Sequence, residues 1–88
     1  MLRVTQDVVE VRGWVESRGG WPVRRLDGRI AIGLRGEARR GVDISWGEFE
    51  PNFCVGRWVF VYDDAPGSAR WFLGSAEEAR RFVNGGVA

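Results

Sequence analysis

The side chains able to support catalysis or bind a metal are few in this chain of 88 residues. It contains no histidine, which removes the commonest general base and the commonest metal ligand. Its single cysteine, Cys54, has no imidazole to activate it, and we expect a buried, inert thiol there. Asp63 and Asp64 are paired carboxylates, but adjacent strand residues point to opposite faces, so they should share neither a proton nor a metal. We therefore predict no enzyme activity, no catalytic or metal site and no cofactor.

Arginine supplies all 13 basic residues, set against 12 acidic ones. Between Arg18 and Gly41 the arginines outnumber the acids, and such a basic segment could contact phosphates. Nucleic-acid binding through the hairpin region Arg24–Arg40 is thus the alternative function, with candidate contacts at Arg24, Arg29, Arg35, Arg39 and Arg40. The net charge of only +1 favours instead a solvated sheet face with arginines lying over apolar neighbours.

Aromatic residues are abundant, with five tryptophans, five phenylalanines and one tyrosine. Trp58, Phe60 and Tyr62 alternate with two valines, which is typical of a strand with two apolar faces. A strand of this kind usually lies in the centre of a sheet, covered on both sides. The alternative is an exposed aromatic row on which a protein or nucleic-acid bases could pack. We predict that these three aromatic residues lie in the core or at a dimer interface.

The elements that must position these residues follow from the spacing of apolar side chains. Valines from Val4 to Val15 recur at helical intervals, predicting a helix with Thr5 as its N-cap that stops at Gly19-Gly20. A hairpin should follow, with a two-residue turn at Asp27-Gly28 that places Val23 opposite Ile32. Its other face would carry arginines and be wet.

The second half of the chain contains two capping-box patterns, one at residues 45–48 and one at residues 75–78. The first predicts a short helix that ends near Pro51, and the second a helix that reaches about Val83. Between them, residues 57–63 and 69–73 predict a second hairpin.

The element order is therefore helix, hairpin, short helix, hairpin, helix. This order predicts an α+β fold of two layers, with about four antiparallel strands in one sheet. Residues 1–84 would form a single compact domain, and residues 85–88 a frayed tail. We expect no membrane partner, because no apolar run approaches ~20 residues. The N-terminus lacks a signal-peptide pattern, and a free cysteine suits a reducing compartment, so we expect a cytoplasmic protein.

Part of the chain, about residues 11–62, resembles a small bacterial protein family of unknown function. Its pattern combines Trp-x-Glu-x-Arg-Gly-Gly-x-Pro with Ile-Ser-Trp-x-x-Phe and an aromatic strand. The matching residues are Trp14, Glu16, Arg18, Gly19, Gly20, Pro22, Ile44, Ser45, Trp46, Phe49, Phe53, Phe60 and Tyr62. The resemblance implies a compact cytoplasmic domain and no known activity.

A surplus of aromatic residues in so small a domain favours a role in protein contacts. We predict a non-enzymatic protein-interaction module, most simply a homodimer, that uses an aromatic sheet face or the open edge of a hairpin. The candidate ligand or partner contacts are Glu16, Arg18, Trp21 and Trp46. The candidate interface residues are Trp58, Phe60 and Tyr62.

Overall fold

Backbone pairing in the computed structural model, which describes residues 1–35 and 41–85, forms two separate antiparallel sheets. One sheet has the strand order β1-β5-β6 and consists of β1 (Leu2–Thr5), β5 (Val59–Asp63) and β6 (Trp71–Gly74). The other has the order β3-β2-β4 and consists of β2 (Trp21–Arg25), β3 (Ile30–Gly33) and β4 (Gly41–Asp43). The helices are α1 (Val8–Ser17), α2 (Trp46–Val55) and α3 (Ala76–Val83). The predicted α+β class is confirmed, whereas the single four-stranded sheet is wrong.

The beginning of the chain adds a third strand to the β5–β6 pair. Residues 2–5 form β1, in which Thr5 pairs with Phe60, so Thr5 is not a helix N-cap. Asp7 is the N-cap instead, and its carboxylate accepts a hydrogen bond of 2.9 Å from the amide of Val9. The Thr5 hydroxyl accepts a bond of 2.9 Å from the Asp7 amide, which stabilises the turn from strand to helix. The valine spacing therefore located α1 but overestimated its length.

The β2–β3 hairpin is present, but its register differs by one residue from the prediction. Arg24 lies opposite Ile30 and Val23 opposite Ala31, because the loop contains three residues rather than two. Gly28 closes this loop with φ of +88°, a conformation that glycine adopts without steric cost. As a result the face that carries Val23 and Ala31 is buried, and the predicted wet, basic face does not exist.

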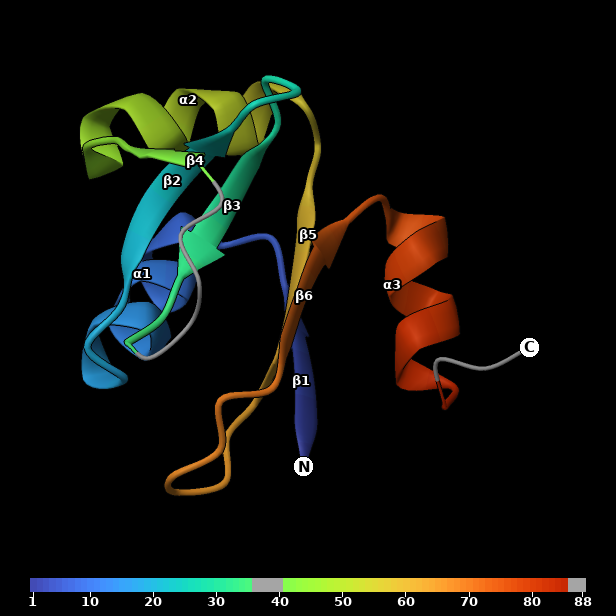
Figure 1. The fold of residues 1–88 in the computed structure, drawn as a ribbon. Coiled ribbons are helices and arrows are strands. Elements are labelled where there is room, and N and C mark those ends of the chain that lie inside the picture. The colour runs from blue at the N-terminus through green and yellow to red at the C-terminus, as the bar shows by residue number, and fades with distance from the viewer. Residues whose placement is uncertain (36–40, 86–88) are drawn as a thin grey trace.

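Strand β5 separates two apolar clusters. Phe60 and Tyr62 point toward α1, α2 and the second sheet, in a cluster with Val11, Trp14, Val15, Ile30, Ile32, Leu34, Phe49 and Phe53. Val59 and Val61 point the other way and pack against Ala79 of α3. Figure 1 shows the same division, with α3 on one side of the β1-β5-β6 sheet and the remaining elements on the other. The alternating pattern of this strand thus reflects burial on both faces.

The helix ends follow local sequence signals only in part. Ser45 and Ser75 are the N-caps of α2 and α3, and each accepts a hydrogen bond of 3.1 Å from the residue three positions on. Both N-caps are confirmed, and the full capping box forms at Ser75, whose amide donates to the Glu78 side chain. Helix α2, however, continues past Pro51 to Val55, so the predicted end near Pro51 is wrong. No helix in the described part of the chain is both long and apolar enough to cross a membrane.

Candidate interaction surface

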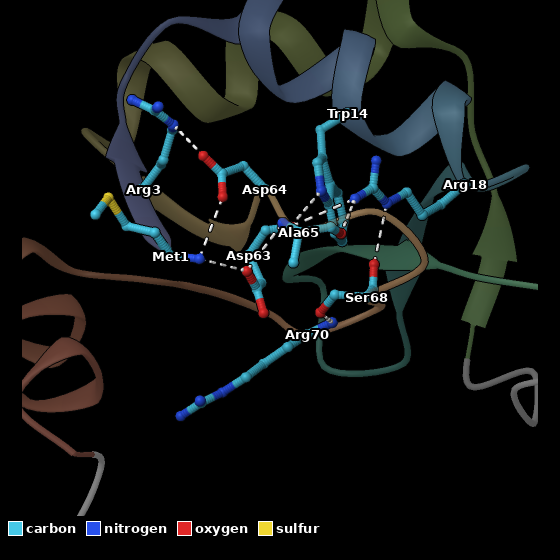
Figure 2. Close-up of polar contacts among 9 residues, drawn as sticks. All are labelled: Met1, Arg3, Trp14, Arg18, Asp63, Asp64, Ala65, Ser68 and Arg70. Carbon is cyan, nitrogen blue, oxygen red and sulfur yellow. Dashed lines mark hydrogen bonds and ion pairs between the residues drawn. The ribbon is translucent and has the colours of Figure 1, made fainter.

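A polar network at the end of β5 holds β1 in place (Figure 2). The Met1 ammonium group lies 3.0 Å from the Asp63 carboxylate and 3.2 Å from that of Asp64. Arg3 donates a hydrogen bond of 2.6 Å to the other oxygen of Asp64. The two carboxylates therefore converge on one ammonium group, because Asp64 lies beyond the end of β5, where the strand alternation assumed in the sequence analysis no longer applies.

The same contacts determine the titration of both carboxyl groups. A hydrogen bond from the amide of Ala65, aided by the Met1 ammonium and Ser68, lowers the pKa of Asp63 to about 2. Hydrogen bonding from Arg3 and from the Met1 ammonium lowers the pKa of Asp64. These groups are exposed enough for water to screen each pair, so they orient the strand more than they stabilise the fold.

Arg18 holds the β5–β6 loop against the end of α1. Its guanidinium donates to the carbonyl oxygens of Ala65 at 2.9 Å and Ser68 at 3.0 Å. It also lies 4.8 Å from the centre of the Trp14 ring, and the Trp14 indole donates a bond of 3.0 Å to the Asp63 carbonyl. Figure 2 shows the two side chains next to each other above the loop. Arg18, a candidate contact residue in the sequence, thus binds the protein's own backbone.

Glu10 joins β1 and β5 to α1. The Tyr62 hydroxyl donates a hydrogen bond of 2.5 Å to one oxygen of Glu10, and the Thr5 hydroxyl donates one of 3.1 Å to the other. Burial, together with the Glu10 carboxylate, raises the pKa of Tyr62 to about 12. Glu10 and the Asp64–Arg3 pair therefore hold the two ends of the short strand β1.

Among residues 1–35 and 41–85, no strand pairs with the outer edge of β1, because the sheet order is β1-β5-β6. The Asp64 amide donates to the Met1 carbonyl at 3.1 Å, and such bonds recur at every second residue of an antiparallel ladder. Arg3 and Thr5 consequently direct their backbone groups toward β5, and Leu2 and Val4 direct theirs outward. The edge thus offers backbone donors and acceptors for another strand.

Beside this edge, a groove of about 480 Å³ separates β1 from α3. It is lined by Val4, Thr5, Gln6, Val59, Ala76, Ala79, Arg80, Val83 and Asn84. Val4 shares its sheet face with its pairing partner Val61, but its side chain is 55% exposed whereas that of Val61 is fully buried. Helix α3 therefore covers the middle of the sheet and leaves the β1 side open. We call the β1 edge and this groove the β1–α3 surface.

The four candidate contact residues do not form one site. Glu16 and Trp46 line a second groove, of about 380 Å³, between α1 and α2. Arg12 connects them, because it lies 3.4 Å from the Glu16 carboxylate and 5.8 Å from the Trp46 ring centre. Arg18 instead faces the β5–β6 loop, and Trp21 packs across the sheet over Gly33.

The arginines predicted to contact nucleic acid are also dispersed. Arg24 pairs with Glu48 of α2, and Arg29 lies 4.9 Å from the ring centre of Trp58. Arg35 lies beyond the other end of β3 from Arg29, about 20 Å away along an extended chain. Arg39 and Arg40 lie outside the described residues. Arg24 and Arg29 thus contact different partners, and Arg35 lies away from both.

The aromatic residues of β5 and the cysteine differ in their burial. Phe60 and Tyr62 are buried in the core, and Trp58 is half-buried against it, so they form no exposed row. Cys54 is exposed, which contradicts the predicted buried thiol, because it lies on the outer side of α2 next to the buried Phe53. Within residues 1–35 and 41–85, no group of three or more potential ligands could hold a metal ion.

Sequence reasoning did not identify the β1–α3 surface. The one available signal was the adjacent β-branched pair Val4-Thr5 before Asp7, which favours a strand followed by a helix N-cap. No family model, no curated protein and no solved structure matches the chain. The resemblance to the bacterial family therefore stays a prediction.

Proposed function

We propose that this chain is a non-enzymatic protein-interaction module that binds an extended segment of a partner protein at the β1–α3 surface. The observation that carries the proposal is the open edge of β1 next to an apolar groove. An extended peptide that joins an exposed strand gains main-chain hydrogen bonds, and pockets for its alternate side chains provide specificity. Here Leu2 and Val4 would supply the main-chain bonds, and Val59, Ala79 and Val83 the apolar contacts.

The edge is already ordered in the free protein, which favours binding. The Arg3–Asp64 pair and the Glu10 hydrogen bonds hold β1 against β5 and α1, so little conformational entropy should be lost there when a peptide binds. A groove of this volume can take a few apolar side chains, and the four-residue strand limits the main-chain contact. We therefore expect moderate, reversible binding.

A partner segment suits this surface better than a second copy of the chain. The groove contains the positive charge of Arg80, and a matching partner should supply a negative one. Strand β1 of a second copy contributes Arg3 and no acidic residue. Nucleic acid, the alternative function, has less support because Arg24 and Arg29 already contact Glu48 and Trp58, and Arg35 lies beyond the far end of β3.

The experiment is selection of extended peptides from a random linear library, first on the wild-type protein and then on Val4→Pro. Because the Val4 amide points outward, proline should be tolerated in the fold while removing a donor and obstructing strand addition. Losing one such hydrogen bond, worth about 1 kcal/mol, and adding a steric block should weaken selected peptides about tenfold. Val9→Ser, which alters another exposed valine, on α1 and outside this surface, is the matched control and should leave affinity unchanged.

Thermal unfolding of each variant establishes that it is folded, and light scattering establishes its oligomeric state. Peptides that lose affinity on Val4→Pro but not on Val9→Ser support the proposal. It is overturned if no peptide is enriched, if folded Val4→Pro binds as tightly as wild type, or if the protein is a dimer that Val4→Pro dissociates.

A further inference from the structure

We infer that Arg80 makes the β1–α3 surface selective for partner segments with an acidic side chain next to apolar ones. This inference rests on the proposed function and adds the chemistry of the ligand. Among the nine residues that line the groove, Arg80 is the one that carries a charge. Its side chain is exposed and stands beside the apolar Ala79 and Val83.

The acidic residues of α3 form an ion pair and a hydrogen bond with groups other than Arg80. Glu77 pairs with Arg81 at 3.2 Å, and Glu78 accepts a hydrogen bond of 2.9 Å from the Ser75 amide in the capping box. Among the described residues, no ion pair involves the Arg80 guanidinium. A guanidinium at the edge of an apolar groove is suited to pair with a carboxylate through two parallel hydrogen bonds.

The position of Arg80 along the groove indicates which kind of carboxylate fits. Lining residues lie before it on α3, at Ala76 and Ala79, and after it, at Val83 and Asn84. The charge therefore lies midway along the groove, and a bound chain can continue past it in both directions. This arrangement favours an Asp or Glu side chain over a C-terminal carboxylate.

The pattern of the bound segment follows from strand geometry. Side chains of an extended peptide point to the groove at every second position. Ala76 and Ala79 are small and leave room for a large apolar side chain, while Arg80 lies next to them on the helix. The bound segment should therefore carry an apolar residue and an acidic residue two positions apart, facing the groove together.

The experiment uses peptides from the selection above in matched pairs that differ only by Glu→Gln or Asp→Asn. Binding is measured to the wild type, to Arg80→Gln and to Arg81→Gln, the last being the control on the same helix outside the groove. The acidic peptide should bind wild type about fivefold more tightly than its amide, and this difference should vanish on Arg80→Gln and persist on Arg81→Gln. Amidation of the peptide C-terminus should have no effect.

Failure of this inference is distinguishable from failure of the proposed function. If peptides bind in a Val4→Pro-sensitive manner but acid and amide forms bind equally, selectivity through Arg80 is overturned and the interaction module stands. A loss of affinity on C-terminal amidation overturns the choice of an acidic side chain. If no peptide is sensitive to Val4→Pro, both conclusions are overturned.

Discussion

Replacing Arg57 with glycine should stabilise the protein, although arginine is usually the better residue in a folded chain. Arg57 has φ of +52° and is the one non-glycine residue with positive φ among those described. It follows α2, where its amide donates to the Cys54 carbonyl at 3.2 Å and the next amide, that of Trp58, donates to Phe53 at 3.1 Å. Helices commonly end in this left-handed conformation, and glycine usually occupies it.

The magnitude follows from two opposing effects. The left-handed conformation costs a residue with a Cβ roughly 1–2 kcal/mol, which glycine avoids. Glycine loses more backbone entropy on folding, and this costs roughly 0.5–1 kcal/mol. The exposed Arg57 side chain makes no hydrogen bond or ion pair with the other described residues, so its removal adds little. Arg57→Gly should therefore gain up to about 1.5 kcal/mol, which raises Tm by up to about 6–12 °C in a domain of this size.

The neighbouring glycine provides the opposite test. Gly56 has φ of −76°, which any residue tolerates, but an added Cβ would overlap the indole nitrogen of Trp58. Gly56→Ala should therefore destabilise the protein by about 1–3 kcal/mol through steric crowding. The assay is urea unfolding followed by tryptophan fluorescence, with equal m-values for all variants.

The sign of the Arg57→Gly effect decides the issue. If α2 ended through Gly56 in the left-handed conformation, as its sequence position suggests, Arg57 would have ordinary backbone angles. The glycine substitution would then destabilise the protein by roughly 0.5–1 kcal/mol. A loss of stability of roughly 0.5–1 kcal/mol refutes the geometry described for this helix end.

Three further predictions concern the polar network and the cysteine. Arg18→Met should cost about 2 kcal/mol in urea unfolding, because two carbonyls lose a charged donor, whereas Arg12→Met should change stability by less than about 0.5 kcal/mol. The pKa of Asp63, lowered from 3.8 to about 2, means that its ionised form stabilises the fold above pH 3.8. This stability is lost as the pH falls toward 2, so Asp63→Asn should flatten the decline of the urea midpoint over that range. Cys54 should react completely with a thiol reagent in the absence of denaturant, and protection until unfolding would contradict its exposure.

Features that depend on neighbours in the sequence could be predicted. Ser45 and Ser75 cap helices because each places a hydroxyl next to an amide three residues on, a contact that four consecutive residues determine. The Glu77–Arg81 pair is likewise local, because its two residues lie one helical turn apart. The α+β class follows from the same local signals.

Features that depend on distant partners could not be predicted. Thr5 follows Val4, whose spacing to the later valines is helical. Thr5 nevertheless belongs to a strand, because Phe60, far along the chain, pairs with its backbone. The hairpin register changed by one residue because Asp27-Gly28 permits two-residue and three-residue loops alike. That single change paired Val23 with the buried Ala31 and paired Arg24 with Ile30, which removed Arg24 from the face of Ala31 predicted to be basic.

The β1–α3 surface exists because one helix is too narrow to cover a sheet of three strands. A helix about 10 Å across covers two strands spaced about 4.8 Å apart, and α3 contributes Ala79 and Phe82 to the cluster over β5 and β6. Strand β1 is the third, and its Val4, on the same sheet face as Val61, remains more than half exposed. A sheet edge that only needed protection from aggregation would favour lysine or another charge at this position. Valine there, next to an apolar groove, is better explained by a surface that is covered when a partner binds.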